Sequence, residues 1–349
     1  MVTLGTDAHK RSHTIVAADE QGRQVGQATV KATPEGHLRA LRWASQWPQR
    51  RWAVEDCRHL SRRLEADLLA AGERVVRVPP KLMAGARRGA RTRGKSDPID
   101  ALAVARAALR EPELPVAHLE GVERQVRLLT DHREDLVAER TRIQQRLRWH
   151  LHELEPGWEL PAGALDRGVW LDAVQGRLAA HQGVVAEIAA ELVARCRELT
   201  GRVNQLQRQL ERLVAPLVPT LLDLDGCGAL TAAKLVGETA GVGRFRSRAA
   251  FAMHNGTAPV PVWSGNRERH RLNRGGNRQL NTALHRIAVT QLRRPGPGRD
   301  YLQRRLAAGD TKTEAIRALR RRISDEVYRR LEADERQRRS QPTCLLPAA

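Results

Sequence analysis

Four acidic residues stand where the sequence predicts strand ends or a helix start. Asp7 ends the first short apolar run, Glu55 ends the fourth, and Asp97 and Asp100 lie one helical turn apart at the head of an alanine-rich segment. Carboxylate oxygens are the ligands that Mg²⁺ prefers. Two such ions about 3.5–4 Å apart can stabilise both the attacking and the leaving oxygen of a phosphodiester displacement. The four residues therefore predict a magnesium site for phosphodiester chemistry.

Each of these acids also has a structural explanation. Asp97-Pro98-Ile99-Asp100 suits a helix N-terminus, with an aspartate cap, proline at the first position and an acid at the third. Glu55 alone is typical of a surface charge at a strand end, and Asp7 alone of a turn. Only the occurrence of all four on the expected elements favours a metal, so both interpretations stay open at this point.

A second candidate group surrounds Ser264-Gly265. A serine hydroxyl is a weak nucleophile at neutral pH, so it needs a base or a metal to take its proton and cations to offset the charge on a pentavalent phosphate. His270 is the nearest candidate base, but spacing alone fits an ordinary basic loop equally well. The arginines that could supply the cations are Arg267, Arg269, Arg271 and Arg274.

Two further segments suit contacts with phosphates. Gly226 and Gly228 flank Cys227 between apolar helical stretches, as in a helix-hairpin-helix element, where turn amides and a helix N-terminus hold a phosphate without reading bases. A simple turn between helices is the alternative. The other segment, between Lys81 and Lys95, is rich in Gly and Arg, and we expect it to be ordered only by a phosphate backbone. Its candidate contacts are Lys81, Arg87, Arg88, Arg91, Arg93 and Lys95.

Composition indicates a polyanionic partner. The 349 residues include 60 Lys and Arg against 40 Asp and Glu, a formal charge of +20, while aromatic residues make up only 3%. Nucleic acid bound mainly through its phosphates fits this balance better than stacked bases do. The four cysteines have no paired spacing, which excludes a Cys-based zinc site and favours a reducing cytoplasm. We expect no signal peptide and no membrane span.

The elements that must position these residues follow from the apolar pattern. The first part reads as an α/β domain with the element order of ribonuclease-H-like folds, in which three antiparallel strands precede alternating helices and strands. Thr33 and Pro34 predict the start of its first helix. The predicted strands are Val2–Asp7, Ser12–Ala18, Gln24–Val30, Trp52–Glu55 and Arg74–Val78, and the later helices are Leu60–Ala71 and Asp97–Leu109.

The middle of the chain predicts long helices. Two apolar stripes with heptad spacing run from Leu119 to Leu154 and from Val185 to Leu217, and Arg133 and Arg140 interrupt the first. A coiled coil that joins two copies of the chain is the preferred interpretation, and a helical hairpin within one chain is the alternative. The predicted domains are residues 1–112 with the metal site, 113–217 as the helical, oligomerising spacer, and a mainly helical 218–349 with the serine loop and a basic tail.

Several motifs together resemble a known family, the transposases of insertion-sequence family 110, also called DEDD transposases or bridge recombinases. GTDAHKRSHTIVA, AVEDC and RGKSDPIDALAVA are similar to the three parts of its RuvC-like metal site. DLDGCGALTAAKLVGETAGVGRFRS and GTAPVPVWSGN with RGGNRQLN are similar to its C-terminal transposase domain.

The resemblance implies that Asp7, Glu55, Asp97 and Asp100 bind Mg²⁺ and that Ser264 attacks DNA to form a phosphoserine intermediate. It also implies a structured bridge RNA that pairs with double-stranded target and donor DNA, a homo-oligomer in which dimers form a tetramer with composite active sites, and a bacterial, nucleoid-associated cytoplasmic protein. A Mg²⁺-dependent nuclease or Holliday-junction resolvase that uses water, with Ser264 non-catalytic, is the alternative. A basic architectural protein without catalysis is a third possibility.

Overall fold

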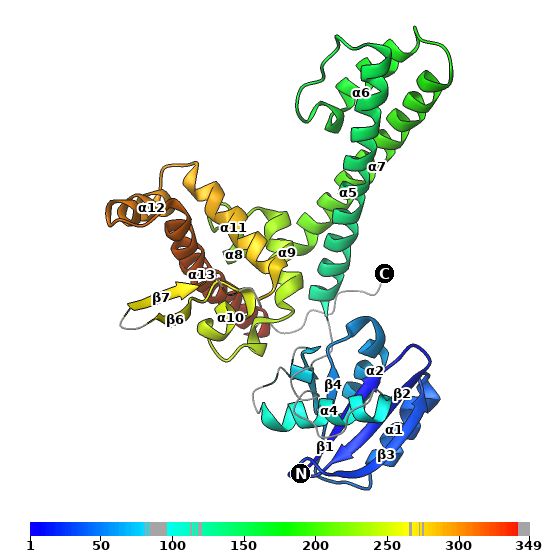
Figure 1. The fold of residues 1–349 in the computed structure, drawn as a ribbon, viewed down its shortest axis with the longest axis vertical. Helices are drawn as coiled ribbons and strands as arrows, with labels where there is room; N and C mark the ends of the chain where they lie inside the picture. Colours follow the sequence, from blue (N-terminus) through cyan, green and yellow to red (C-terminus); the bar gives the residue numbers. More distant parts are fainter. Residues whose placement is uncertain are drawn as a thin grey trace. The chain divides into compact units, whose positions relative to one another are not determined.

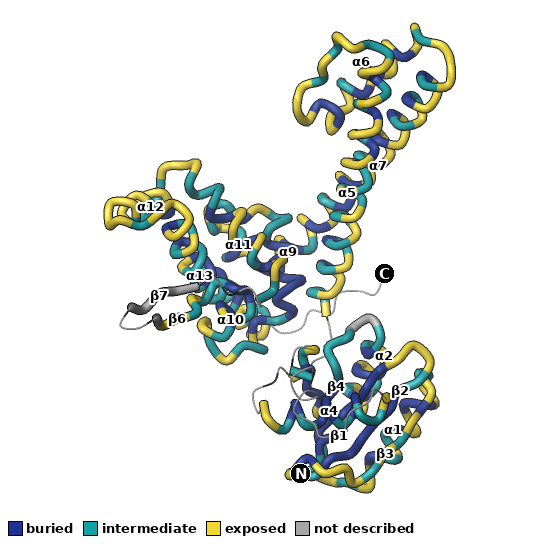
Figure 2. Tube along the Cα trace, in the orientation of Figure 1, coloured by how far each residue is buried: buried dark blue, intermediate teal, exposed yellow. Residues whose placement is uncertain are grey.

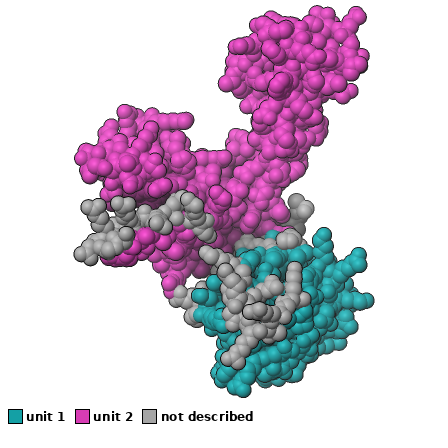
Figure 3. Space-filling model, viewed as in Figure 1, with its two compact units in different colours: residues 1–120 teal, residues 121–349 magenta. Residues whose placement is uncertain are grey.

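The computed structural model describes two compact units, Met1–Glu120 and Gly121–Ala349 (Figure 3). Each unit is considered by itself. The described residues are 1–80, 82–83, 96–111, 114, 116–117, 121–264, 267–271, 273 and 276–340.

The first unit is built on a five-stranded mixed sheet with the strand order β3-β2-β1-β4-β5 (Figure 1). β1, β2 and β3 are antiparallel neighbours, whereas β4 runs parallel to β1 and β5 runs parallel to β4. This confirms the predicted α/β character and element order. The strands are β1 (Val2–Ala8), β2 (Ser12–Ala18), β3 (Gln24–Lys31), β4 (Arg50–Glu55) and β5 (Val75–Val78).

Among the described residues, the two faces of this sheet are covered by α1 (Pro34–Ala44), α2 (Arg58–Ala70) and α4 (Asp97–Arg110). The Thr33 side chain accepts a hydrogen bond from the Gly36 amide, so it caps α1 as the sequence predicts. Apolar residues of α1 and α2 form one core with Leu4, Ile15 and Trp52, and those of α4 form a second core with β4 and β5. The sheet is therefore the middle of three layers.

The second unit begins with a helical hairpin of α5 (Val122–Leu154) and α7 (Val184–Val214), with the 3₁₀ turn η1 (Ala164–Asp166) and α6 (Gly168–Leu178) between them. The two long helices are antiparallel, because Arg133 donates to Gln207 and Arg140 donates to Thr200, each over 3.1 Å. The arginines that interrupt the stripe thus bond across the hairpin. Most of the predicted α7 stripe is buried within the chain: Ala189, Cys196, Leu199, Val203, Leu206, Leu210 and Leu217.

The apolar stripe of α7 is therefore buried within one chain, as the alternative of a helical hairpin predicts. Association of two copies stays a prediction that must use other surfaces. No described helix combines the length and the apolar character that a membrane span requires.

The remaining helices pack around one core (Figure 2). Val126 of α5 and Leu210 of α7 belong to the same cluster as Phe251 and Val327, so residues 113–217 and 218–349, predicted as separate domains, share it. The domain boundaries stay a prediction. The elements are α8 (Pro219–Leu222), α9 (Ala229–Thr239), η2 (Val242–Arg244), α10 (Arg248–Asn255), β6 (Val260–Ser264), β7 (Arg267–Arg271), α11 (Arg278–Leu292), α12 (Pro297–Ala307) and α13 (Lys312–Ser340).

Candidate functional site

Strand alternation places Asp7 and Glu55 on the same face of the first unit's sheet. Leu4 faces the core of α1 and α2, so Gly5 and Asp7 face α4. Ala53 belongs to the core that α4 covers, and Glu55 has the same parity in β4. The parallel register pairs Thr6 with Val54, so Asp7 and Glu55 occupy the next position on two neighbouring strands.

Helix α4 begins beside these strand ends and contributes the other two acids. Ser96 precedes the helix as its N-cap, and Asp97 is the first helical residue, so capping does not explain the Asp97 carboxylate. Gly5 lets the helix approach closely, since a Cβ there would lie 2.1 Å from the Ala101 carbonyl oxygen. Asp100, on the next turn, is 8% exposed.

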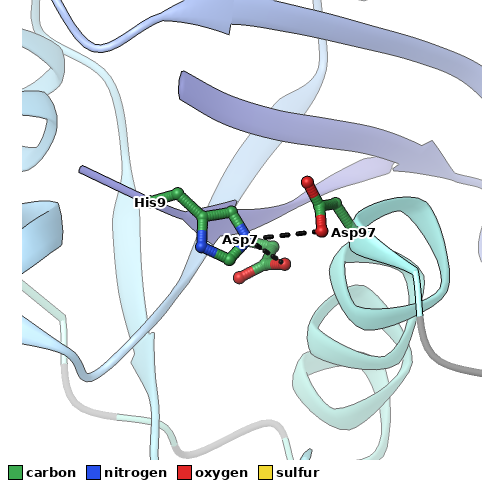
Figure 4. A group of neighbouring side chains, drawn as sticks. All are labelled: Asp7, His9 and Asp97. Atoms are coloured by element: carbon green, nitrogen blue, oxygen red, sulfur yellow. Dashed lines mark hydrogen bonds and ion pairs between the residues drawn. The ribbon is translucent and has the colours of Figure 1, made fainter. Parts of the chain in front are cut away.

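His9 completes a compact cluster with Asp7 and Asp97 (Figure 4). Its Nε2 lies 3.1 Å from Asp7 Oδ2 and 3.4 Å from Asp97 Oδ1. Their ligand atoms all lie within 4.8 Å of one another. His9 is not among the residues expected from the acidic pattern, although its position two residues beyond Asp7, just past the end of β1, is a usable signal.

The electrostatics of the cluster connects all four acids. Burial raises the pKa of Asp7, and the charges of Asp100 and Asp97 raise it further against the lowering effect of His9. Burial also raises the pKa of Glu55, to which the charges of Asp7 and Asp100 add. These carboxylates are therefore close enough to repel one another.

A divalent cation fits this arrangement. It would cancel the mutual repulsion of the carboxylates, and their oxygens are ligands for a hard metal such as Mg²⁺ or Mn²⁺. Asp7 and Asp97 could hold the ion directly with His9 beside them, while Glu55 and Asp100 lie within electrostatic reach.

The second candidate group lies on the hairpin of β6 and β7. Its register pairs Ser264 with Arg267, Val262 with Arg269 and Val260 with Arg271. Because paired positions share a face, Ser264 falls on the same face of the ribbon as the positions of these three arginines. His270 pairs with Pro261 and therefore occupies the alternate face. The register argues against His270 as the base for Ser264.

Only the backbone is described for Ser264 and for residues 267–271. Arg274 and the predicted phosphate contacts Lys81, Arg87, Arg88, Arg91, Arg93 and Lys95 lie outside the described residues.

The glycine turn before α9 has a packing role. The helix begins at Ala229 as predicted, but α8 before the turn has only 4 residues, so a helix-hairpin-helix element is not established. Gly226 has φ +85°, and a Cβ there would lie 3.0 Å from the Ile287 carbonyl oxygen of α11. No atom of the described residues lies within 4 Å of a Cβ at Gly228. Close packing explains Gly226, and phosphate binding at this turn stays a prediction.

Comparison with known proteins matches both halves of the chain to transposases. Residues 4–156 match the model of the IS110 DEDD transposases, described as "Transposase". Residues 218–303 match the model described as "Transposase IS116/IS110/IS902 family".

Individual relatives agree with these models. The uncharacterized 44.8 kDa protein of insertion element IS116 from Streptomyces clavuligerus is 29% identical, over 94% of both chains. The uncharacterized 42 kDa protein of IS900 from Mycobacterium paratuberculosis is 27% identical, over 92% of this chain and 93% of the relative. Among solved structures, Thermus thermophilus RuvC in complex with a Holliday junction substrate covers 34% of this chain and 99% of its own, with 16% identity and a TM-score of 0.27. The two family matches and the relatives that align along nearly the whole chain show that this protein belongs to the IS110 family of transposases.

Proposed function

We propose that this transposase cuts and rejoins DNA through a phosphoserine intermediate, with Ser264 as the nucleophile and with Mg²⁺ held by Asp7, Glu55, Asp97 and Asp100. The observation that carries the proposal is the convergence of these acids at the ends of β1 and β4 and the start of α4. Bound there, Mg²⁺ supplies positive charge for the oxygens that change bonds at the phosphorus.

The chain's own residues divide the remaining work. The Ser264 oxygen forms a bond to phosphorus, a DNA oxygen leaves as a hydroxyl, and the energy of the phosphodiester is kept in the serine ester for rejoining. The positions of Arg267, Arg269 and Arg271 on the same ribbon face suit the neutralisation of charge at that phosphate. The serine hydroxyl gives up one proton as its oxygen bonds to phosphorus, and the leaving DNA oxygen takes up one proton, so the step is balanced by general acid and base transfer.

The partners in this proposal are double-stranded target and donor DNA and a structured bridge RNA. Base pairing by the RNA would specify sequence while the protein binds backbones, which suits a charge of +20 with 3% aromatic residues. The working form would be a homo-oligomer, dimers forming a tetramer, in which acids and serine come from different copies. It would act on the bacterial nucleoid.

A covalent-trapping experiment tests the proposal. The protein is incubated with RNA transcribed from the DNA that flanks its gene and with nicked DNA that traps the intermediate, with and without Mg²⁺. We expect an adduct that survives denaturation in wild type, disappears in Ser264→Ala, and requires Mg²⁺. Ser45→Ala, an exposed serine at the end of α1, is the matched control and should form the adduct normally.

The acids are tested with the same assay. Asp7→Ala, Glu55→Ala and Asp100→Ala should each abolish cleavage and leave RNA binding near wild type, whereas Glu191→Gln on the exposed side of α7 should do neither. Cleavage without any adduct would contradict the proposal and indicate a nuclease that uses water as the nucleophile. DNA binding without cleavage under every condition would leave a non-catalytic architectural protein.

A further inference from the structure

We infer that a cavity in the second unit binds the sugar-phosphate backbone of a single nucleic-acid strand. The cavity has a volume of about 1100 Å³ and lies among α10, α12, α13 and the segment that leads into β6. This inference shares with the proposed function a nucleic-acid partner, but it depends on neither the serine nor the metal. Its lining includes six arginines: Arg248, Arg305, Arg317, Arg320, Arg321 and Arg322.

The acidic residues of the lining neutralise only part of this charge. Arg305 pairs with Asp310 over 2.5 Å, and Arg321 pairs with Asp325. The third acid, Glu314, accepts a 2.6 Å bond from the Thr311 hydroxyl. Hydrogen bonds from Thr311 lower the pKa of Glu314, and the charge of Arg317 lowers it further, so this acid offsets part of the charge of Arg317. Six arginines against three acids leave the described lining with an excess of positive charge.

Arg320 shows the effect of this excess positive charge most directly. Its Nη1 donates to Asn281 over 2.9 Å, while its buried Nε has no partner among the described residues. Burial lowers its pKa, and the neighbouring charge of Arg317 lowers it further. An anion in the cavity would relieve this repulsion.

The size and chemistry of the lining favour a strand over a small molecule or a duplex. Nine of the sixteen lining residues that the structure describes are charged, whereas small-molecule pockets are mostly apolar, and a concave site of about 1100 Å³ suits one strand better than the wider double helix. Tyr301 lines the cavity, but the Arg322 guanidinium lies 4.7 Å from the centre of its ring and covers one face. Tyr301 therefore has at most one ring face on which a base could stack. We expect the cavity to bind mainly through phosphates, without sequence preference.

The cavity is continuous with the serine strand. Thr257, Ala258 and Pro259 line it and lead directly into β6, which ends at Ser264 (Figure 1). This segment is anchored, since the Asn281 side chain donates to the Asn255 carbonyl. A strand held in the cavity would thus be bound at the base of the hairpin that carries the proposed nucleophile.

The test is fluorescence anisotropy with a labelled oligothymidylate of about eight nucleotides, in EDTA, over a series of salt concentrations. We expect Arg317→Gln and Arg320→Gln each to weaken binding about 10-fold and to reduce the salt slope by about 0.7. Arg317→Glu should weaken it further, and Arg317→Lys should retain most of it. Arg317 is exposed on α13, so its substitution spares the core.

Arg329→Gln is the matched control, because Arg329 lies on the same helix, is 66% exposed and pairs with Glu326 outside the cavity. Hydrogen exchange supplies the location: the oligonucleotide should slow exchange of the amides of Thr257 and Ala258 in wild type but not in Arg317→Glu. Equal losses in Arg317→Gln and Arg329→Gln, or unchanged exchange at these amides, would overturn the inference.

If a polyglutamate peptide of equal charge displaced the oligothymidylate as well as unlabelled oligonucleotide does, the occupant would be an acidic protein instead. Tighter binding of a duplex than of the single strand would also overturn the inference. Because EDTA prevents metal-dependent cleavage, failure of the serine mechanism leaves the result standing. The arginine variants could lose oligonucleotide binding and still form the adduct normally on duplex DNA. That result would show that the cavity binds a strand which the serine reaction does not require.

Discussion

Gly5→Ala should loosen the contact between β1 and α4 on which the acidic cluster depends. The added Cβ would lie 2.1 Å from the Ala101 carbonyl oxygen and 2.5 Å from the Ala105 amide nitrogen. Both are backbone atoms and cannot rotate away. Non-bonded heavy atoms prefer roughly 3.5 Å, so relieving the contact with the Ala101 oxygen requires a shift of about 1.4 Å.

The expected size of the effect follows from this overlap. Overpacking a well-filled interior typically costs about 1–3 kcal/mol. Local opening of β1 and α4 should then become roughly 5- to 140-fold more frequent, since each 1.4 kcal/mol is a factor of ten. Hydrogen exchange of the amides in these two elements measures the change and isolates it from the second unit, which need not unfold together with the first.

The same shift moves Asp97 and Asp100 away from Asp7, so Mn²⁺ binding, followed by electron paramagnetic resonance, should weaken as well. Gly201→Ala in α7 is the control, because in the described part of the chain no atom lies within 4 Å of the added Cβ. It should be neutral or raise stability by roughly 0.5–1 kcal/mol through better helix propensity. Unchanged exchange in β1 and α4 of Gly5→Ala would refute the close-packing explanation.

Three further changes probe charges of the first unit. Asp7→Asn should raise the melting temperature at neutral pH in EDTA, because it removes a buried charge whose pKa the fold raises, and it should abolish the increase that Mg²⁺ gives wild type. Glu65→Ala should destabilise by roughly 2 kcal/mol, visible in urea unfolding, because it removes the acceptor of the 2.8 Å bond from Arg77 and of the 2.7 Å bond from Ser61; equal stability would show that these bonds contribute nothing net. Burial lowers the pKa of His13 to about 4 from its ordinary 6.5, so the unfolded chain binds this proton first as pH falls. Stability should therefore drop by at most roughly 3 kcal/mol between pH 6.5 and 4, and thermal unfolding of His13→Gln should show a flatter pH dependence.

Local patterns predicted much of the first unit. β2 has the predicted bounds, because an alternating run of branched and apolar residues lies between two turns, and α1 begins where Thr33 and Pro34 predict. β4 begins two residues earlier than expected, at Arg50. Arg51 is buried there and donates to the Thr3 hydroxyl and the Ala108 carbonyl. A hydrophobicity pattern does not identify a strand residue whose burial depends on partners 48 and 57 residues away.

Tertiary partners account for the other differences. The heptad spacing of α7 specifies a helix with an apolar face, but not which helix covers it, and in this chain α5 does. His9 joins the acids only because β1 ends beside the start of α4, a proximity that Gly5 permits and that spacing does not reveal. The positions of the acids were predictable, since each stands at the end of an element whose type and order the sequence indicates, while their role as metal ligands stays a prediction.

The acidic cluster of the first unit and the arginine-lined cavity of the second unit both hold like charges close together, an arrangement that does not favour stability. The carboxylates of Asp7 and Glu55 repel their neighbours at the end of a well-packed sheet, and Arg320 is partly buried beside Arg317 in the second unit. Neutral side chains of similar size would remove the repulsion, so its presence indicates that each group meets an opposite charge in use. A cation would offset the charge of the acids in the first unit, and an anion would offset the charge of the arginines in the second. An acidic site in one unit and a basic site in the other are expected of a protein that binds metal ions at the first and phosphates at the second.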